Sequence, residues 1–277
     1  MSQSEADTTV PPRPATAPRW QQGSWPVWVF FLALLLVLIK DVPAVVIAVV
    51  GGPTALGRGQ TAMLTLILLL AAGLLAARTA PGRLTRAHLG LQAVPWRQLV
   101  LWGVIAIGAL YVPLLVGTAL GQTGAQDTNL GLGKSLISDV LLLVATAGVG
   151  PVAEEIAYRA VMFRALCDGL AKRVSPRVAA GLAAVISAAV FSLVHVGAPP
   201  WHLASYFAFG LVLAVAYWWT GSLLVTVVPH VLNNTYSALA LAKAADSAVL
   251  MGVALLGPFV AAVLVFAIAT GLGSARR

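Results

Sequence analysis

Long apolar stretches, separated by short polar segments, make up most of this chain. Eight of them are long enough to cross about 30 Å of hydrocarbon at about 1.5 Å of helix per residue. They cover residues 26–50, 61–77, 97–120, 135–165, 178–197, 201–220, 222–243 and 247–272. The pattern predicts an all-α, polytopic integral membrane protein with about eight transmembrane helices.

Two features modify this simple series of spans. Residues 1–25 are polar and contain several prolines, which predicts a disordered cytoplasmic tail. The stretch 135–165 is longer than one span needs and contains Gly148, Gly150 and Pro151. Because glycine and proline bend or interrupt helices, we expect a kinked helix or two elements here. We favour one kinked helix, since a split would disturb the charge bias of the later loops.

The composition supports a membrane protein. Hydrophobic residues make up 60% of the 277 residues and charged residues 9%, whereas soluble domains average about 25% charged residues. These values exclude an ordinary soluble enzyme, a disordered protein and a nucleic-acid binder of the usual kind. The single cysteine, Cys167, rules out an intrachain disulfide and a cysteine-rich metal site.

Basic residues are distributed unequally between the two sides that eight spans would define. The side that carries both termini holds 12 of them: Arg13, Arg19, Arg78, Arg83, Arg86, Arg97, Arg164, Lys172, Arg173, Arg177, Arg276 and Arg277. The other side holds 3, namely Arg58, Lys134 and Lys243, while Lys40 and Arg159 fall within predicted spans. Because cytoplasmic loops are enriched in Lys and Arg, this bias predicts a multi-pass protein of the cell membrane with both termini in the cytoplasm.

A few polar residues interrupt the apolar stretches, and they are the candidates for chemistry. An ionisable group inside a span costs roughly 2.5–3.5 kcal/mol on insertion scales, and such groups usually mark function. In the segment EEIAYR at 154–159, Glu155 and Arg159 are four residues apart and can pair on one helix face. Glu154 points about 100° away and is left as the candidate general base. The alternative is that both acids are structural, neutralised by Arg159 and a distant histidine.

Two further segments carry histidines at helical spacing. Phe191 lies one turn before His195 and can pack against its ring, although a histidine near a helix end is often only a packing residue. His230 and Asn234 share a helix face and could together bind an oxyanion, or simply link neighbouring helices by hydrogen bonds. The spacing of the turns allows Glu154, His195 and His230 to meet in one polar pocket below the cytoplasmic face.

In this order, the three segments resemble the motifs of the CPBP family, which includes CAAX prenyl endopeptidases and bacteriocin-processing or bacteriocin-immunity proteins. The family pattern is EExxxR, FxxxH and HxxxN, and here it reads EEIAYR, FSLVH at 191–195 and HVLNN at 230–234. The resemblance implies an intramembrane endopeptidase in which Glu154 is the general base and His195 assists it. It implies further that His230 and Asn234 stabilise the oxyanion.

On this resemblance, Glu155, Arg159, Phe191 and Asn233 would support the site. The resemblance, together with the predicted spans, divides the chain into four parts. These are the tail 1–25, N-terminal transmembrane helices at 26–134, a CAAX protease-like core at 135–240, and a last helix and short tail at 241–277. The expected partners are the lipid bilayer and a peptide or protein substrate, prenylated or not, in a bacterial host. No nucleic-acid partner and no cofactor are expected.

Three alternatives stay open at this point. Glu154, His195 and His230 could form a zinc site, although the chain has no H-E-x-x-H motif. The protein could be a non-catalytic scaffold or a bacteriocin self-immunity factor that uses the same pocket. A proton-coupled transporter is the third, but it would be expected to show paired broken helices, and the chain has one evident break at Gly150–Pro151.

Overall fold

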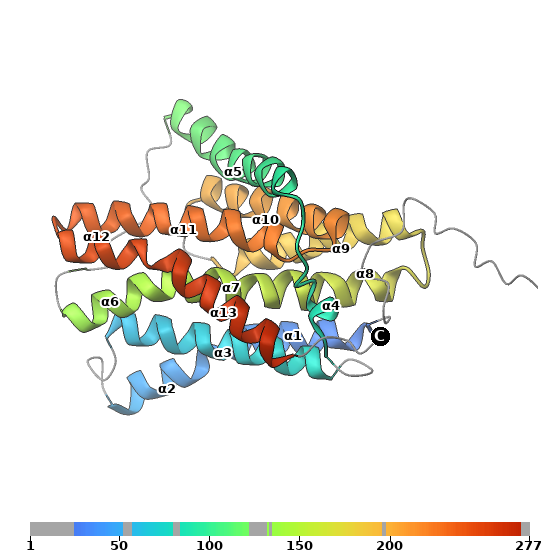
Figure 1. The fold of residues 1–277 in the computed structure, drawn as a ribbon, viewed down its shortest axis with the longest axis horizontal. Helices are drawn as coiled ribbons and strands as arrows, with labels where there is room; N and C mark the ends of the chain where they lie inside the picture. The colour runs from blue at the N-terminus through green and yellow to red at the C-terminus, as the bar shows by residue number, and fades with distance from the viewer. Residues whose placement is uncertain are drawn as a thin grey trace, which may run out of the picture.

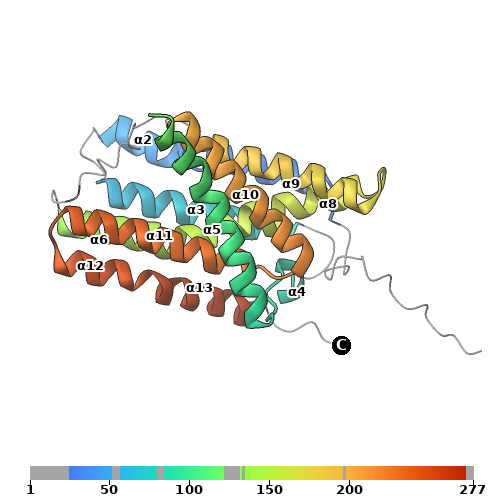
Figure 2. The ribbon, with the colours of Figure 1, turned by 90° about the horizontal axis from the view of Figure 1, so that it is seen from above.

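The computed structural model describes residues 25–51, 57–79, 84–121, 132, 135–195 and 198–272. Of the predicted tail at 1–25, only Trp25 lies within these residues. The described residues form helices and short connections without a strand, which confirms the all-α prediction. The helices run side by side along one common direction, with α5 crossing them obliquely (Figures 1 and 2).

The first part of the chain forms five helices: α1 (Trp28–Ile39), α2 (Val42–Gly51), α3 (Arg58–Arg78), the short α4 (Arg86–Leu89) and α5 (Trp96–Ala119). A long helical rod follows, built from α6 (Leu136–Val144), η1 (Ala145–Val149), α7 (Gly150–Glu155), η2 (Ile156–Phe163) and α8 (Arg164–Leu170). The remaining helices are α9 (Pro176–Leu193), α10 (Pro200–Thr220), α11 (Leu224–Ala244), α12 (Ala248–Leu255) and α13 (Gly257–Gly271).

Six helical segments among the described residues are long and apolar enough to cross a membrane. They are Arg58–Arg78, Trp96–Ala119, Leu136–Leu170, Pro176–Leu193, Pro200–Thr220 and Ala248–Gly271. The protein is therefore a multi-pass membrane protein, but the predicted count of eight is not confirmed. The first predicted span is divided between α1 and α2, which are each too short, and α11 carries the polar residues of the third motif, which lower its hydropathy.

The overlong fourth stretch is one continuous helical rod, as favoured from the sequence, rather than two elements. It accommodates its glycines and proline through the π-helical segments η1 and η2 instead of a break. Pro151 is the second residue of α7, just after η1, where its missing N–H interrupts the helical ladder. Gly148 permits close contact with α13, because an added Cβ would lie 2.9 Å from the Cβ of Val260.

The bundle has two ends that differ in charge. At one, which we call the basic end, α8 turns into α9 through residues 171–175, α10 turns into α11 through residues 221–223, and α4 lies nearby (Figure 1). At the other, which we call the opposite end, α3 and α6 begin, α9 and α11 end, and α10 and α12 begin. The first turns of α3 and α6 are joined at this end by a hydrogen bond from the Gly59 N–H to Ser138 Oγ, 3.0 Å.

The core of the bundle surrounds the middle of the long rod. Every residue of η2, from Ile156 to Phe163, is buried. α1, α3, α4, α9 and α10 all contact this segment. A single turn of α7 and η2 therefore places the EExxxR side chains in the centre of the bundle, where their charges must be satisfied by other helices.

Candidate active site

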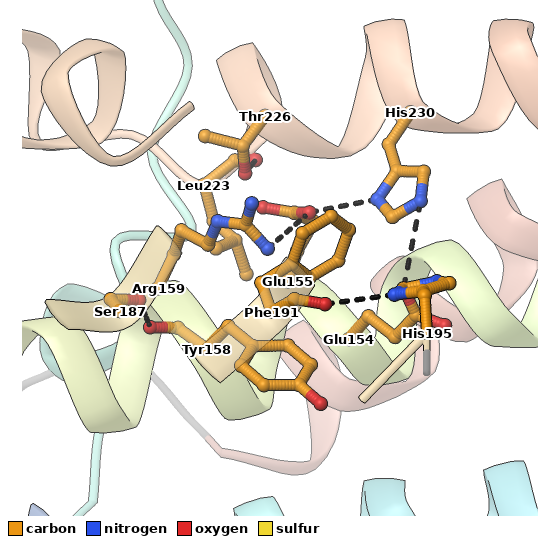
Figure 3. Close-up of polar contacts among 10 residues, drawn as sticks. All are labelled: Glu154, Glu155, Tyr158, Arg159, Ser187, Phe191, His195, Leu223, Thr226 and His230. Atoms are coloured by element: carbon orange, nitrogen blue, oxygen red, sulfur yellow. Dashed lines mark hydrogen bonds and ion pairs between the residues drawn. The ribbon is translucent and has the colours of Figure 1, made fainter. Parts of the chain in front are cut away.

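Glu155 lies at the centre of a buried charged cluster. Its Oε1 is 3.0 Å from Arg159 Nη1 and 2.8 Å from His230 Nδ1 (Figure 3). The three side chains are between 0% and 4% exposed. The pair of Glu155 and Arg159 is the one expected from their spacing, but its link to His230, 75 residues along the chain, comes from the packing of α11 against α7.

Aromatic and backbone contacts hold this cluster in place. The guanidinium of Arg159 lies 4.4 Å from the centre of the Phe191 ring, within the range of a cation–π contact. The same ring packs edge-on against the rings of Tyr158 and His230, at 5.3 and 5.9 Å between centres. The Ser187 hydroxyl donates a 3.0 Å hydrogen bond to the Tyr158 carbonyl of η2. Phe191 thus contacts residues of both the first and the third motif.

Glu154 occupies a different environment from its neighbour. Its side chain is 19% exposed, and its Oε2 lies 3.6 Å from His230 Nε2. His230 therefore lies between the two carboxylates, held closely by Glu155 through Nδ1 and facing Glu154 through Nε2 (Figure 3). Glu154 lacks a partner on its own helix, as predicted, and its partner is the distant histidine of the structural alternative. The looser contact and the exposure leave the Glu154 carboxylate available to a bound molecule.

His195 lies just beyond the end of α9, in a fixed ring orientation. Its Nδ1 is 2.8 Å from the Phe191 carbonyl, so this nitrogen carries the proton of the neutral ring and donates it to the carbonyl. The ring packs 5.1 Å from Phe191, as predicted, and 4.3 Å from Tyr206 at an interplanar angle of 30°. Nε2 is then the nitrogen left for chemistry.

The two asparagines of the third motif form a chain of hydrogen bonds. Tyr111 donates to Asn233 Oδ1 at 3.1 Å, and Asn233 Nδ2 donates to Asn234 Oδ1 at 3.1 Å. Asn234 Nδ2 donates to the Thr146 carbonyl at 3.0 Å, within the π-helical segment η1. One of the two amide protons of Asn234 is thereby committed, and the other remains for a ligand.

A cavity of about 520 Å³ brings these groups together. Its polar lining consists of Thr146, Glu154, His195, Tyr206, His230, Asn233, Asn234, Tyr236 and Ser237. Glu155 and Arg159 do not line it. The lining continues along α11 to Ala244, the last residue of that helix, and so towards the opposite end of the bundle. Glu154, His195 and His230, which the spacing of the turns allows to meet, all line this one cavity, and the position of the cavity relative to the cytoplasmic face stays a prediction.

Comparison with known proteins identifies the segment that holds the site. Residues 136–236 match a family model described as type II CAAX prenyl endopeptidase Rce1-like. This segment is therefore similar to the CAAX protease family. No curated protein and no solved structure matches the chain. The matched segment includes all three motifs and extends from the start of α6 to the middle of α11.

Several residues of the site lie outside the three motifs, and the sequence analysis did not find them. Thr146, Tyr236 and Ser237 line the cavity, and two tyrosines contact the motif residues directly. Tyr111 belongs to α5, before the family segment, and Tyr206 lies on α10 between the second and third motifs. Both are ordinary aromatic residues within apolar spans, so nothing in the local pattern distinguishes them. Only the helix packing brings their rings to Asn233 and His195.

The zinc alternative requires three ligands around one point. Among the residues that the structure describes, no group of three or more His, Cys, Asp or Glu side chains is arranged to hold a metal ion. His230 Nδ1 is already bonded to Glu155, which leaves this ring one nitrogen, facing Glu154.

Proposed function

We propose that this protein is an intramembrane endopeptidase in which Glu154 activates water for attack on a peptide bond. The observation that carries the proposal is the difference between the two adjacent carboxylates. Glu155 is fully buried and bonded to Arg159 and His230, whereas Glu154 borders a cavity large enough for a peptide segment. A site built only for structure would have no reason to expose the second acid. The similarity of residues 136–236 to the CAAX protease family supports the same reaction class.

The proposed reaction needs no covalent intermediate. A water molecule beside Glu154 transfers a proton to the carboxylate as its oxygen attacks the carbonyl carbon of the substrate. The carbonyl π electrons move to oxygen and form an oxyanion. When the tetrahedral intermediate collapses, the C–N bond breaks, and the proton held by Glu154 passes to the leaving nitrogen. The products are a carboxyl terminus and an amine, and Glu154 returns to its starting state.

The neighbouring side chains would perform two supporting tasks. His195 Nε2 orients the attacking water together with Glu154, because Nδ1 is held by the Phe191 carbonyl. The second amide proton of Asn234 and the Nε2 of a protonated His230 stabilise the oxyanion.

The test is cleavage of peptides by the purified protein in detergent. Quenched fluorogenic peptides, with and without a prenylated CAAX-type terminus, are compared for the wild type, Glu154→Gln and Glu155→Gln, with and without a zinc chelator. We expect Glu154→Gln to reduce kcat by about 10²-fold or more while the protein stays folded, and the wild-type activity to survive chelation.

Three results would contradict this proposal. Full activity of Glu154→Gln on a genuine substrate would exclude Glu154 as the base. Activity lost to the chelator and restored by zinc would make Glu154 and the two histidines metal ligands. A biological phenotype that survives Glu154→Ala but not Arg159→Ala would favour the scaffold or immunity function, because only the fold-supporting residue would then matter.

A further inference from the structure

We infer, on the basis of the proposed endopeptidase function, that the substrate enters from the non-cytoplasmic face as an extended and uncharged stretch of peptide. The first observation is the direction of the cavity. On each helix that contributes to it, the lining residues lie between the level of Glu154 and the opposite end: Thr146 and Gly150 on the rod, Phe191 and His195 at the end of α9, and Tyr206 and Phe209 in the first half of α10.

Helix α11 shows the same direction most clearly. Its lining residues start at His230 and continue through Tyr236 and Ser237 to Ala244, which is the C-terminal residue of the helix at the opposite end. No lining residue of this cavity lies on α11 before His230. The cavity therefore runs from the candidate catalytic groups to the opposite end alone.

The basic side of the site is closed by tightly packed side chains. Tyr158 and Arg159 follow Glu154 along the rod, and both are buried to within 1% of full burial. Ser187 of α9 and Thr226 of α11 lie at the same level, and Tyr217 of α10 packs on Phe163 nearer the basic end, at 6.1 Å between ring centres. All three are 0% to 1% exposed. None of these residues lines the cavity. A substrate arriving at the basic end would have to pass through this packed layer.

The distribution of charge assigns a membrane side to each end. The basic end of the described chain carries Arg78, Arg86, Arg97, Lys172, Arg173 and Arg177 in or beside its connections. The corresponding residues at the opposite end of the described chain are Arg58 and Lys243. Lys40, in the turn between α1 and α2, lies nearer the middle of the bundle and pairs with Asp41 at 2.7 Å. By the positive-inside rule the basic end is cytoplasmic, so the cavity extends from the candidate catalytic groups towards the other face.

The length and lining of the cavity define the class of substrate. Ala244 is 14 residues beyond His230, which is about 21 Å of helix and matches about six residues of extended peptide. Apart from Glu154 and the two histidines of the candidate catalytic site, the lining residues that the structure describes are uncharged. The fitting substrate is thus an unfolded, uncharged segment of about six residues, presented by an exported peptide or by the outer end of another membrane protein. A prenylated terminus that approached from the cytoplasm would meet the basic side of the site, which is closed by packed side chains.

Thiol labelling tests the direction of access without requiring activity. Cys167 is buried and is first replaced by alanine. Three single-cysteine variants are then made: Ala240→Cys in the cavity, Lys172→Cys at the basic end and Val185→Cys on the exposed apolar face of α9. Each is treated with a membrane-impermeant, permanently cationic methanethiosulfonate, in spheroplasts and in inverted membrane vesicles.

We expect Ala240→Cys to react at least about tenfold faster in spheroplasts than in inverted vesicles, because the charged reagent does not cross hydrocarbon. Lys172→Cys should show the reverse, and Val185→Cys, in contact with lipid, should react in neither. Labelling of Ala240→Cys only from inverted vesicles, or from neither side, would overturn the inference, and so would labelling of Lys172→Cys in spheroplasts.

A second measurement separates this inference from the proposed function. An uncharged quenched peptide is added to spheroplasts or to inverted vesicles that carry the wild type or Glu154→Gln. Cleavage that depends on Glu154 and occurs in spheroplasts supports both. Glu154-dependent cleavage only in inverted vesicles overturns the direction of access and leaves the proposed function standing. If neither preparation cleaves the peptide, the proposed function loses support while the labelling result still decides the direction of access.

Discussion

Replacement of Arg159 by methionine should destabilise the folded protein by about 3–5 kcal/mol, because it leaves the Glu155 carboxylate buried without its cation. The two side chains are 1% and 0% exposed, and their charged atoms are 3.0 Å apart. The substitution also removes the guanidinium from the face of the Phe191 ring, 4.4 Å away. Methionine is close to arginine in length, so lost volume contributes little to the effect.

A double variant separates the stranded charge from the loss of packing. In Glu155→Gln/Arg159→Met both charges are gone, while the glutamine oxygen still accepts the hydrogen bond from His230 Nδ1. Since replacement of a whole buried ion pair is often close to neutral, the double variant should recover most of the lost stability. Arg173→Met, at an exposed position in the turn before α9, is the matched control and should change stability by less than about 0.5 kcal/mol.

The assay is thermal unfolding of the three variants in the same detergent. At about 2–4 °C per kcal/mol for a chain of this size class, Arg159→Met should lower Tm by about 6–20 °C. A loss below about 1 kcal/mol would refute the view that Arg159 balances a buried carboxylate, because an uncompensated buried charge costs more than that. A double variant as unstable as the single one would show that the packing on Phe191, and not the charge, dominates.

Two further substitutions test the helix packing and the polar chain around the cavity. Gly59→Ala should lower Tm strongly, because its Cβ would clash with the Ser138 carbonyl oxygen. Gly181→Ala meets nothing within 4 Å and should be neutral or stabilising by up to about 1 kcal/mol from helix propensity. Tyr111→Phe should reduce peptidase activity about 2- to 10-fold, because it removes the 3.1 Å hydrogen bond that orients Asn233. Its Tm should change little. An unchanged kcat would show that Tyr111 has no part in the site.

The sequence by itself determined the features that depend on local spacing and hydropathy. The apolar stretches identified a multi-pass helical membrane protein, and the four-residue spacing of Glu155 and Arg159 predicted an ion pair that the structure contains at 3.0 Å. The order of the three motifs led to the CAAX protease family. Each of these follows from neighbours on one helix, whose relative positions are fixed by 3.6 residues per turn.

The tertiary structure decided what depends on contacts between helices. His230 reaches Glu155 across 75 residues, and Tyr111 reaches Asn233 across 122. No periodicity within a helix encodes which faces of two helices meet, because that choice depends on how small residues such as Gly59 and Gly148 let backbones approach. For the same reason the direction of the cavity was not predictable. It depends on which half of the bundle is filled by side chains, and here Tyr158, Arg159 and Tyr217 fill the half towards the basic end.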